Sequence, residues 1–387
     1  MTETLTALSP ESLQELQALV LVAGEKNYGL QPLLSGQSPD SHSTKSLPLD
    51  FSRLNKITSF DPQEAFITAE AGCSIKQLNA ALQYSNWRLP FSFPESATLF
   101  DIFTQPWPGF RQIQTFPLAH WVTGITAVTG DVKLLNYGGP VMKNVTGHDL
   151  CKLFVGSQSV FGLITSLTLR LVPKTRYQQA ILLDFNSYAD AQQFVDEVLL
   201  KTANSMLETA CLFRLKSLFS WKLLLDFAGT QPDIQATIET LLGQYQVRKY
   251  SALPVEPQSP QQVLELLGKL HWPDLACQFS MPYTQAIRQP QLFQDLDTLD
   301  AWWNILANTF GVHLSGTLVE NPNTLVFLKN QIESAEGIIH THADLSTNYH
   351  TILDTASNAG ADEVSKRWLR ELKHQFDPKG VLPALRG

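Results

Sequence analysis

The sequence predicts an α+β fold of two domains, and three observations support this. The chain has 387 residues, enough for two hydrophobic cores. Residues 163–172 (LITSLTLRLV) alternate with a period of two, as a strand with one buried face does. After Pro173 glycine becomes scarce, and segments with strand character alternate with segments with helical character. We expect a first domain over residues 1–175, a second α+β domain over 176–350, and a C-terminal helix and tail over 351–387 that packs back on the first domain.

Composition narrows the class of protein. The chain is 44% hydrophobic and 17% charged, which is typical of a folded protein with sizeable cores. Its formal charge is 28 − 36 = −8 without a basic block, which argues against nucleic-acid binding. No apolar run approaches the ~20 residues that span a bilayer, and the N-terminus lacks the basic segment and apolar core of a signal peptide. We therefore expect a soluble, cytoplasmic protein with no transmembrane segment.

Neither the cysteines nor the histidines predict a metal site. The cysteines are far apart and none has CxxC spacing, so we expect reduced, buried thiols rather than an iron–sulfur cluster or a structural zinc. His340 and His342 would share one strand face, but HTHADLSTNYH lacks a third ligand in fixed geometry, so we expect a polar surface strand. The cysteines are Cys73, Cys151, Cys211 and Cys277.

The N-terminal segment predicts a helix followed by a loop. Ser9 can cap this helix, and its apolar stripe runs from Leu13 to Ala23. Gly29 is expected to end it. Residues 35–46 are rich in Ser, Gly and Pro, which predicts a loop.

Two strands and a second helix are expected next. The strands lie at residues 47–51 and 65–70. Ser74, with Gln77 three residues later, has the capping-box pattern of a helix start. Residues 86–121 are rich in proline and aromatic residues and predict irregular structure.

The stretch from Gly138 to Pro173 (GGPVMKNVTGHDLCKLFVGSQSVFGLITSLTLRLVP) combines several glycines with a strand. Before it, residues 122–128 and 132–137 are expected to pair as a hairpin. Within it, DLCKLFV is long enough for two helical turns, and the strand follows. Glycine-punctuated turns let a ligand approach the backbone closely, so this stretch is a candidate binding site.

The second half of the chain predicts strands and helices in alternation. A proline-rich linker is expected at residues 251–262, and Trp302 and Trp303 are expected to be core residues. In the C-terminal helix, residues 361–376, an apolar face would be formed by Val364, Trp368, Leu372 and Phe376. The expected strands are 181–185, 221–227, 276–281, 312–319 and 337–343, and the expected helices are 189–200, capped by Ser187, and 232–242.

Five segments together resemble a known family. They are DFSRLNKI, FITAEAGCSIKQLNAAL, LPFSFPESATL, the stretch from Gly138 to Pro173, and LKHQFDPKGVLP near the C-terminus. In order and spacing they resemble the FAD-linked oxidases of the vanillyl-alcohol oxidase / p-cresol methylhydroxylase (PCMH) fold. The phrase VMKNVTGHDL is especially similar to the FAD-binding subunits of glycolate oxidase (glycolate dehydrogenase).

This resemblance implies a fold and a cofactor. The fold would be a type-2 (PCMH-like) FAD-binding domain of two α+β subdomains, with a C-terminal α+β cap domain near the isoalloxazine ring. FAD would lie between the subdomains, and backbone N–H groups would hold its pyrophosphate. These would come from a loop after the first helix and from a Gly-Gly turn after the ATL segment. The residues implied to face the cofactor are Ser35, Gly36, Ser38, Thr98, Lys143, Asn144, Gly147, His148 and Asp149, with Ser157, Gly162 and Ile164 at the adenine–ribose end.

The sequence departs from the family pattern at the same places. The first loop keeps only Gly36 where the family has several glycines. Phe100 and Asp101 replace the Gly-Gly turn, and Ser159-Val160 replaces the Gly-Thr of the third glycine motif. If Asp101 lay beside a pyrophosphate, each unit-charge repulsion at ~4 Å would cost about 1 kcal/mol in water and several at a protein surface.

Two hypotheses of different classes remain open, and a stand-alone oxidase is a third possibility. In the first, the chain is an FAD-dependent 2-hydroxy-acid dehydrogenase subunit, which oxidises glycolate or a related acid in a complex with a sister flavoprotein and an iron–sulfur subunit. In the second, the flavin fold has lost its cofactor and serves as a structural or assembly subunit. His148 and Arg111 can be nominated as catalytic groups, but no acid–base constellation identifies a catalytic residue.

Overall fold

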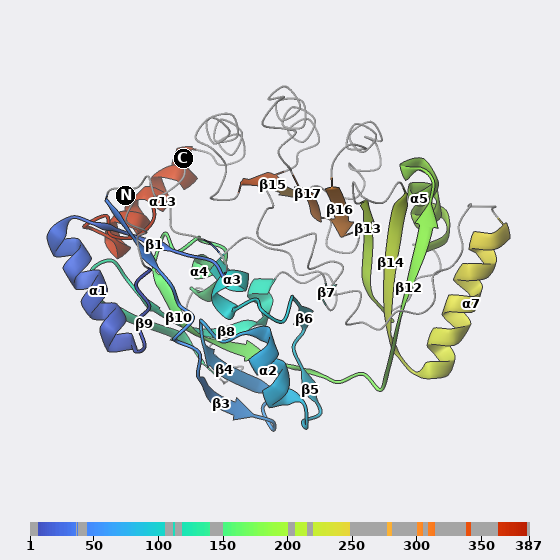
Figure 1. Cartoon of the computed structure of the whole chain (residues 1–387), viewed down its shortest axis with the longest axis horizontal. Helices are drawn as coiled ribbons and strands as arrows, with labels where there is room; N and C mark the ends of the chain where they lie inside the picture. The colour runs from blue at the N-terminus through green and yellow to red at the C-terminus, as the bar shows by residue number, and fades with distance from the viewer. Residues whose placement is uncertain are drawn as a thin grey trace, which may run out of the picture. The chain divides into compact units, whose positions relative to one another are not determined.

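The structure is a computed structural model with two compact units (Figure 1). The first unit comprises Met1–Gly109, Pro117–Lys174 and Ala361–Arg386, and the second comprises Phe110–Phe116, Thr175–Gly360 and Gly387. The first unit is therefore built from both ends of the chain. The structure describes residues 7–35, 37, 45–104, 111–112, 118–139, 150–199, 206–214, 220–247, 277–280, 300–304, 309–313, 338–341 and 363–384.

The first unit is organised around a five-stranded antiparallel sheet in the order β3-β4-β10-β8-β9. Its central strand β10 is the alternating segment of the sequence, and the structure buries side chains on both of its faces. Two smaller sheets pair β1 with β2 in parallel and β11 with β5 antiparallel. The elements are α1 (Leu13–Lys26), β1 (Gly29–Pro32), β2 (Ser46–Leu49), β3 (Ile57–Asp61), β4 (Phe66–Glu70), α2 (Ile75–Leu82), β5 (Trp87–Arg88), β6 (Phe91–Ser92), α3 (Leu99–Thr104), the 3-10 helix η1 (Leu118–Trp121), β8 (Val122–Val128), β9 (Leu134–Gly138), α4 (Cys151–Phe154), β10 (Leu163–Arg170), β11 (Val172–Pro173) and α13 (Glu363–Phe376).

Helix α1 begins and ends at other residues than predicted. Ser12 is the N-cap, since its side chain accepts a hydrogen bond from the Glu15 N–H, whereas Ser9 donates its hydroxyl to Asp50. At the other end Asn27 adopts the left-handed conformation (φ 56°) that closes the helix. Gly29, which was expected to end the helix, is instead the first residue of β1.

Helix α2 begins as predicted and packs beside a close backbone contact. Ser74 and Gln77 form a complete capping box. Just before it, the backbone at Gly72 approaches the Phe51 carbonyl so closely that a Cβ there would lie 2.0 Å from the oxygen. The Gly72 N–H donates to the Leu54 carbonyl at 2.8 Å. Only glycine fits this position, which holds the β4–α2 connection against the turn after β2.

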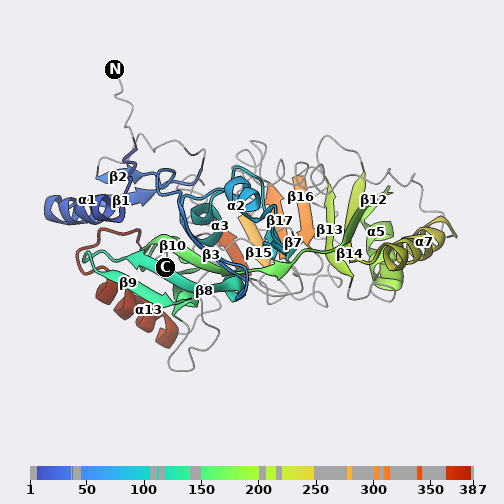
Figure 2. The same ribbon diagram turned by 90° about the horizontal axis from the view of Figure 1, so that it is seen from below.

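The C-terminal helix α13 belongs to the first unit and runs along the β8–β9 end of its sheet (Figure 2). The Gly130 N–H, at the tip of the β8–β9 hairpin, donates to the Phe376 carbonyl at 2.9 Å. The Leu30 N–H in β1 donates to the Val381 carbonyl at 2.7 Å. The predicted apolar face is only partly buried, because Trp368 is 61% exposed.

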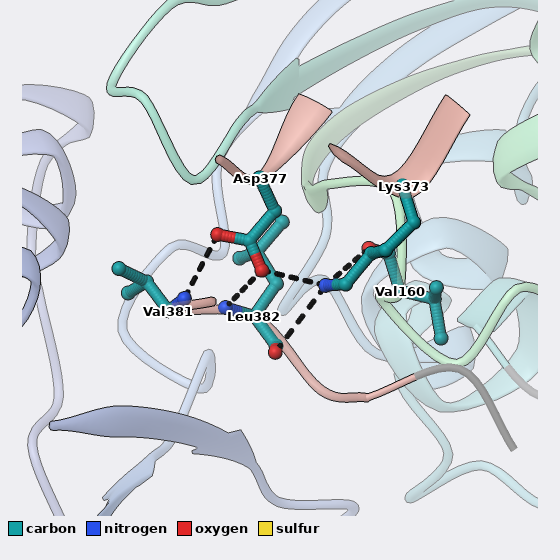
Figure 3. Close-up of polar contacts among 5 residues, drawn as sticks. All are labelled: Val160, Lys373, Asp377, Val381 and Leu382. Atoms are coloured by element: carbon teal, nitrogen blue, oxygen red, sulfur yellow. Dashed lines mark hydrogen bonds and ion pairs between the residues drawn. The ribbon is translucent and has the colours of Figure 1, made fainter. Parts of the chain in front are cut away.

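A buried ion pair fixes the tail that follows α13 (Figure 3). Lys373 Nζ donates to Asp377 Oδ2 at 2.6 Å, to the Val160 carbonyl at 3.0 Å and to the Leu382 carbonyl at 3.3 Å. The Asp377 carboxylate, whose side chain is fully buried, also accepts the backbone N–H groups of Val381 and Leu382 at 2.8 and 2.9 Å. Burial lowers the pKa of the Lys373 ammonium, and its pairing with Asp377 opposes that shift.

The second unit contains a seven-stranded antiparallel sheet in the order β12-β14-β13-β16-β17-β15-β18. The tryptophans Trp302 and Trp303 lie on a strand, β16, that the sequence did not predict. The elements are β7 (Arg111–Gln112), β12 (Tyr177–Phe185), α5 (Tyr188–Phe194), the π-helix η2 (Val195–Leu199), β13 (Leu207–Arg214), β14 (Trp221–Gly229), α7 (Gln231–Val247), β15 (Cys277–Ser280), β16 (Asp300–Asn304), β17 (Thr309–His313) and β18 (Ile338–Thr341).

Helices α5 and α7 pack beside β12 and β14, as Figure 1 shows. Ser187 caps α5 as predicted, by accepting the Asp190 N–H. The rings of Phe185, Phe194 and Tyr245 pack edge to face or tilted against one another, with centroids 5.4 to 5.7 Å apart. Among the helices that the structure describes, none is long and apolar enough to cross a membrane.

Candidate cofactor site

Two of the loops that the resemblance assigns to FAD are hydrogen-bonded to helix α3. All six residues of α3, Leu99–Thr104, are buried, although the segment was expected to be irregular. Near the N-terminal end of α3, the Asp101 side chain accepts a hydrogen bond from the loop after β1. At the C-terminal end, two carbonyls accept hydrogen bonds from the turn before β10. At 1.5 Å per residue these ends lie roughly 9 Å apart.

Asp101 joins the loop after β1 to the start of α3. Its Oδ1 accepts the Ser35 N–H at 2.8 Å, and its Oδ2 accepts the Thr98 N–H at 2.7 Å. In return, the Asp101 N–H donates to Thr98 Oγ1 at 3.2 Å, so the two residues form a reciprocal cap at the start of α3. The residue is 1% exposed. Burial raises the pKa of the Asp101 carboxyl, and the hydrogen bonds from Ser35 and Thr98 oppose this shift.

Phe100 stands where the family has a glycine, and its bulky ring is accommodated by stacking on another ring. Its ring stacks on that of Phe51, with centroids 4.1 Å apart and planes 12° apart. Its N–H donates to the Ala71 carbonyl at 2.6 Å, and the preceding N–H, of Leu99, donates to the Cys73 carbonyl at 2.9 Å. The backbone amides from Thr98 to Asp101 therefore all have acceptors within the chain.

The turn between α4 and β10 is bonded to the other end of α3. The Gly156 N–H donates to the Phe103 carbonyl at 2.8 Å, and the Gln158 N–H donates to the Thr104 carbonyl at 2.7 Å. Gly156 has a positive φ of 75°, and so do two residues that are not glycine, Gln158 (52°) and Ser159 (63°). Ser159, which stands where the family motif has glycine, is 1% exposed, and its hydroxyl has no hydrogen-bond partner. Ser159 thus adopts a left-handed backbone, which favours glycine, at the position where the family motif has glycine.

The residues implied to line the adenine–ribose end are engaged in packing. Ser157 Oγ donates to the Phe154 carbonyl at 2.8 Å, at the end of α4. A Cβ on Gly162 would lie 2.8 Å from the ring of Phe154, so this glycine makes room for that ring. Ile164 is fully buried in β10, where it pairs with Ala127 of β8. Helix α4 has one turn rather than the two expected, and Val155, in extended conformation, ends it.

Other candidate residues lie outside the part of the chain that the structure describes. Arg111 lies in β7, which belongs to the second unit, and His340 lies in β18. Among the described residues, no group of three or more His, Cys, Asp or Glu side chains could hold a metal ion. The candidates outside the described residues are Gly36, Ser38, Lys143, Asn144, Gly147, His148, Asp149 and His342.

Comparison with known proteins identifies a matching domain family and several relatives. The family described as "FAD binding domain" matches residues 5–138. The chain is 35% identical over 123 residues to glycolate oxidase subunit GlcE of Escherichia coli, covering 31% of this chain and 35% of that protein. It is 27% identical over 217 residues to D-lactate dehydrogenase of Archaeoglobus fulgidus, covering 53% of this chain and 47% of that protein. The matched segments thus span between a third and half of these relatives.

Solved structures show the same fold over nearly the whole chain. 4-Ethylphenol oxidase from Gulosibacter chungangensis superposes with a TM-score of 0.72 at 16% identity, covering 98% of this chain and 88% of that one. p-Cresol methylhydroxylase superposes with a TM-score of 0.71 at 14% identity, covering 97% and 87%. The predicted α+β, PCMH-like fold is therefore confirmed. The matched domain and the fold support FAD as the cofactor.

At the loops expected to hold the pyrophosphate, the described residues do not fit that group. A pyrophosphate needs backbone N–H groups that point to it without a competing acceptor. Here the Ser35 and Thr98 amides are bonded to the Asp101 carboxylate, and the amides of Phe100 and Asp101 are bonded within the chain. The chain nevertheless has the PCMH-type fold, and its residues 5–138 match the FAD-binding domain family.

Proposed function

We propose that this chain is a subunit of a multi-subunit, FAD-dependent oxidoreductase that oxidises glycolate or another small 2-hydroxy acid. The relatives support the reaction class, because their names include a glycolate oxidase subunit, a D-lactate dehydrogenase and D-2-hydroxyglutarate dehydrogenases. The acids in those names all carry a hydroxyl next to a carboxylate. In such reactions a bound flavin supplies the acceptor for the substrate's hydride.

The partners we propose are a sister flavoprotein and an iron–sulfur subunit. Two relatives, GlcE of Escherichia coli and GlcD of Bacillus subtilis, are named as subunits of glycolate oxidase, which supports a complex. Among the cysteines whose burial the structure describes, Cys73, Cys151 and Cys211 are buried within this chain, so we assign any metal cluster to another subunit. We place the complex in the cytoplasm, with any membrane association peripheral and made through the complex.

One observation favours a second candidate role within the same complex. The carboxylate of Asp101 takes the amides of Ser35 and Thr98 that would face the pyrophosphate. A chain whose pyrophosphate-facing amides are occupied by its own carboxylate would serve as a structural or assembly subunit beside a sister flavoprotein that carries the flavin.

Purification of the native complex through a tag on this chain tests the proposal. We expect absorbance between about 350 and 500 nm from flavin, bleached by glycolate or D-lactate under anaerobic conditions. A complex that contains flavin but whose flavin no 2-hydroxy acid reduces would refute the reaction class. Flavin released by denaturing the chain alone would assign the cofactor to this subunit, and a colourless chain in an active complex would establish the structural role.

A further inference from the structure

We propose that Asp101 acts as an internal anion, which occupies the backbone amides of two loops and thereby excludes the diphosphate of a dinucleotide. The proposal concerns the cofactor site of the proposed function and is tested without turnover. The Asp101 carboxylate and a diphosphate would compete for the N–H groups of Ser35 and Thr98.

The Asp101 carboxylate bonds to two separate loops. Each of its two oxygens accepts a backbone N–H, from Ser35 at 2.8 Å and from Thr98 at 2.7 Å. These donors are 63 residues apart in sequence (98 − 35) and belong to two different loops. One carboxylate therefore links two loops through their amides, as a bound phosphate group does at a backbone anion site.

The hydrogen bonds of the Asp101 carboxylate exceed what a helix cap requires. The reciprocal bonds between Thr98 and Asp101 suffice to cap α3. The bond from Ser35 reaches Asp101 across 66 residues and is not part of that cap. The side chain thus connects the loop after β1 to α3, in addition to starting the helix.

The surroundings of the Asp101 carboxylate are closed to solvent. Asp101 is 1% exposed, and the neighbouring Phe100 ring is stacked on Phe51. A diphosphate at these amides would have to displace a buried carboxylate or lie against it, and two anions at contact distance repel each other. Removing the carboxylate frees both amides and removes that repulsion together.

Binding to the full-length chain tests this inference, with ADP and inorganic pyrophosphate as probes in calorimetric titrations. The variant Asp101→Gly restores the small residue typical of this fold, and we expect it to bind ADP at least tenfold more tightly than the wild-type chain does. Asp61→Gly is the matched control, because the Asp61 carboxylate also accepts two backbone N–H groups, from Gln63 and Glu64 at 2.8 and 3.0 Å, in an exposed turn. We expect no gain in affinity from that variant. Equal ADP affinity in wild type and Asp101→Gly would overturn the inference.

Hydrogen exchange in the wild-type chain gives a second test that needs no variant. We expect millimolar ADP or pyrophosphate to leave the exchange rates of the Ser35 and Thr98 amides unchanged. Slower exchange at both amides would show that a diphosphate reaches them in the presence of Asp101, and would overturn the inference. That result would leave the proposed reaction standing, whereas a complex inactive toward 2-hydroxy acids would leave the Asp101 result untouched.

Discussion

Replacing Asp377 with asparagine should detach the C-terminal tail from the first unit. Asparagine keeps the size of the side chain but removes its charge. Lys373 Nζ would retain the carbonyls of Val160 and Leu382 and lose the carboxylate that lies 2.6 Å away. Because the Lys373 side chain is only 14% exposed and that of Asp377 is fully buried, water cannot replace the lost partner.

The size of the effect follows from this burial. Removing one partner of a buried ion pair costs about 3–5 kcal/mol. The carboxamide can also accept only one of the two N–H groups, of Val381 and Leu382, that Asp377 now accepts, which adds about 1 kcal/mol. A local loss of about 4–6 kcal/mol corresponds to roughly a thousandfold or greater increase in the population of the detached state.

Native-state hydrogen exchange can measure this detachment. The Leu30 and Gly130 amides are suitable reporters, since they donate to the carbonyls of Val381 and Phe376 and are not altered by the substitution. We expect both to exchange about a thousandfold faster or more in Asp377→Asn. The control is Glu371→Gln, which breaks an exposed pair with Arg367 at the same i,i+4 spacing on the same helix and should cost under about 0.5 kcal/mol. Equal effects of the two substitutions would refute the reasoning.

The pH dependence of the same variant has a defined sign. Burial lowers the pKa of Lys373 in the folded chain, and Asp377 is the group that raises it. In Asp377→Asn that pKa should fall further below the value of the unfolded chain, about 10.4. Between the two pKa values the unfolded state binds more protons, so stability rises with pH there. We therefore expect the melting-temperature difference between Asp377→Asn and wild type to shrink from about pH 7 to about pH 9.5.

Three further substitutions test other parts of the first unit, each by thermal or urea unfolding. Ser159→Gly should stabilise the folded chain by about 1 kcal/mol, because it relieves a left-handed backbone (φ 63°) and removes a buried hydroxyl without a partner. An unchanged free energy of unfolding would contradict the inference that the Ser159 backbone is strained. Gly72→Ala should destabilise by more than about 2 kcal/mol, since its Cβ would meet the Phe51 carbonyl at 2.0 Å, whereas Gly29→Ala, with its nearest neighbour at 3.8 Å, should change stability little. Ser74→Ala removes the cap of α2 and should cost about 1 kcal/mol, so an unchanged midpoint would mean that the cap contributes nothing.

Local patterns in the sequence predicted the elements whose signals are contained within a few residues. The capping box of Ser74 and Gln77, the cap at Ser187 and the alternation in β10 are signals of this kind. The start of α1 was wrong because Ser9 and Ser12 are both suitable caps. The structure selects Ser12, since the Ser9 hydroxyl is bonded to Asp50, 41 residues away.

The role of Asp101 could be anticipated only in part. A carboxylate next to a pyrophosphate suggested repulsion, and the pattern Thr98-x-x-Asp101 is itself a helix-start signature that indicates the cap. The bond from Ser35 depends on how two distant segments meet, and no local pattern encodes it. Likewise, Phe100 is tolerated in place of glycine because Phe51 lies parallel to it, a contact across 49 residues (100 − 51).

The position of Lys373 has a consequence for the order in which this chain folds. Its bond to the Val160 carbonyl joins residues 213 apart, and closing a flexible loop of that length costs about 5 kcal/mol in chain entropy. Most of that loop is the second unit, Thr175–Gly360. Once the second unit has folded, the effective loop is much shorter. We expect the second unit to complete its folding before the first unit, whose sheet forms early and then waits for α13 and the tail bonded to Asp377.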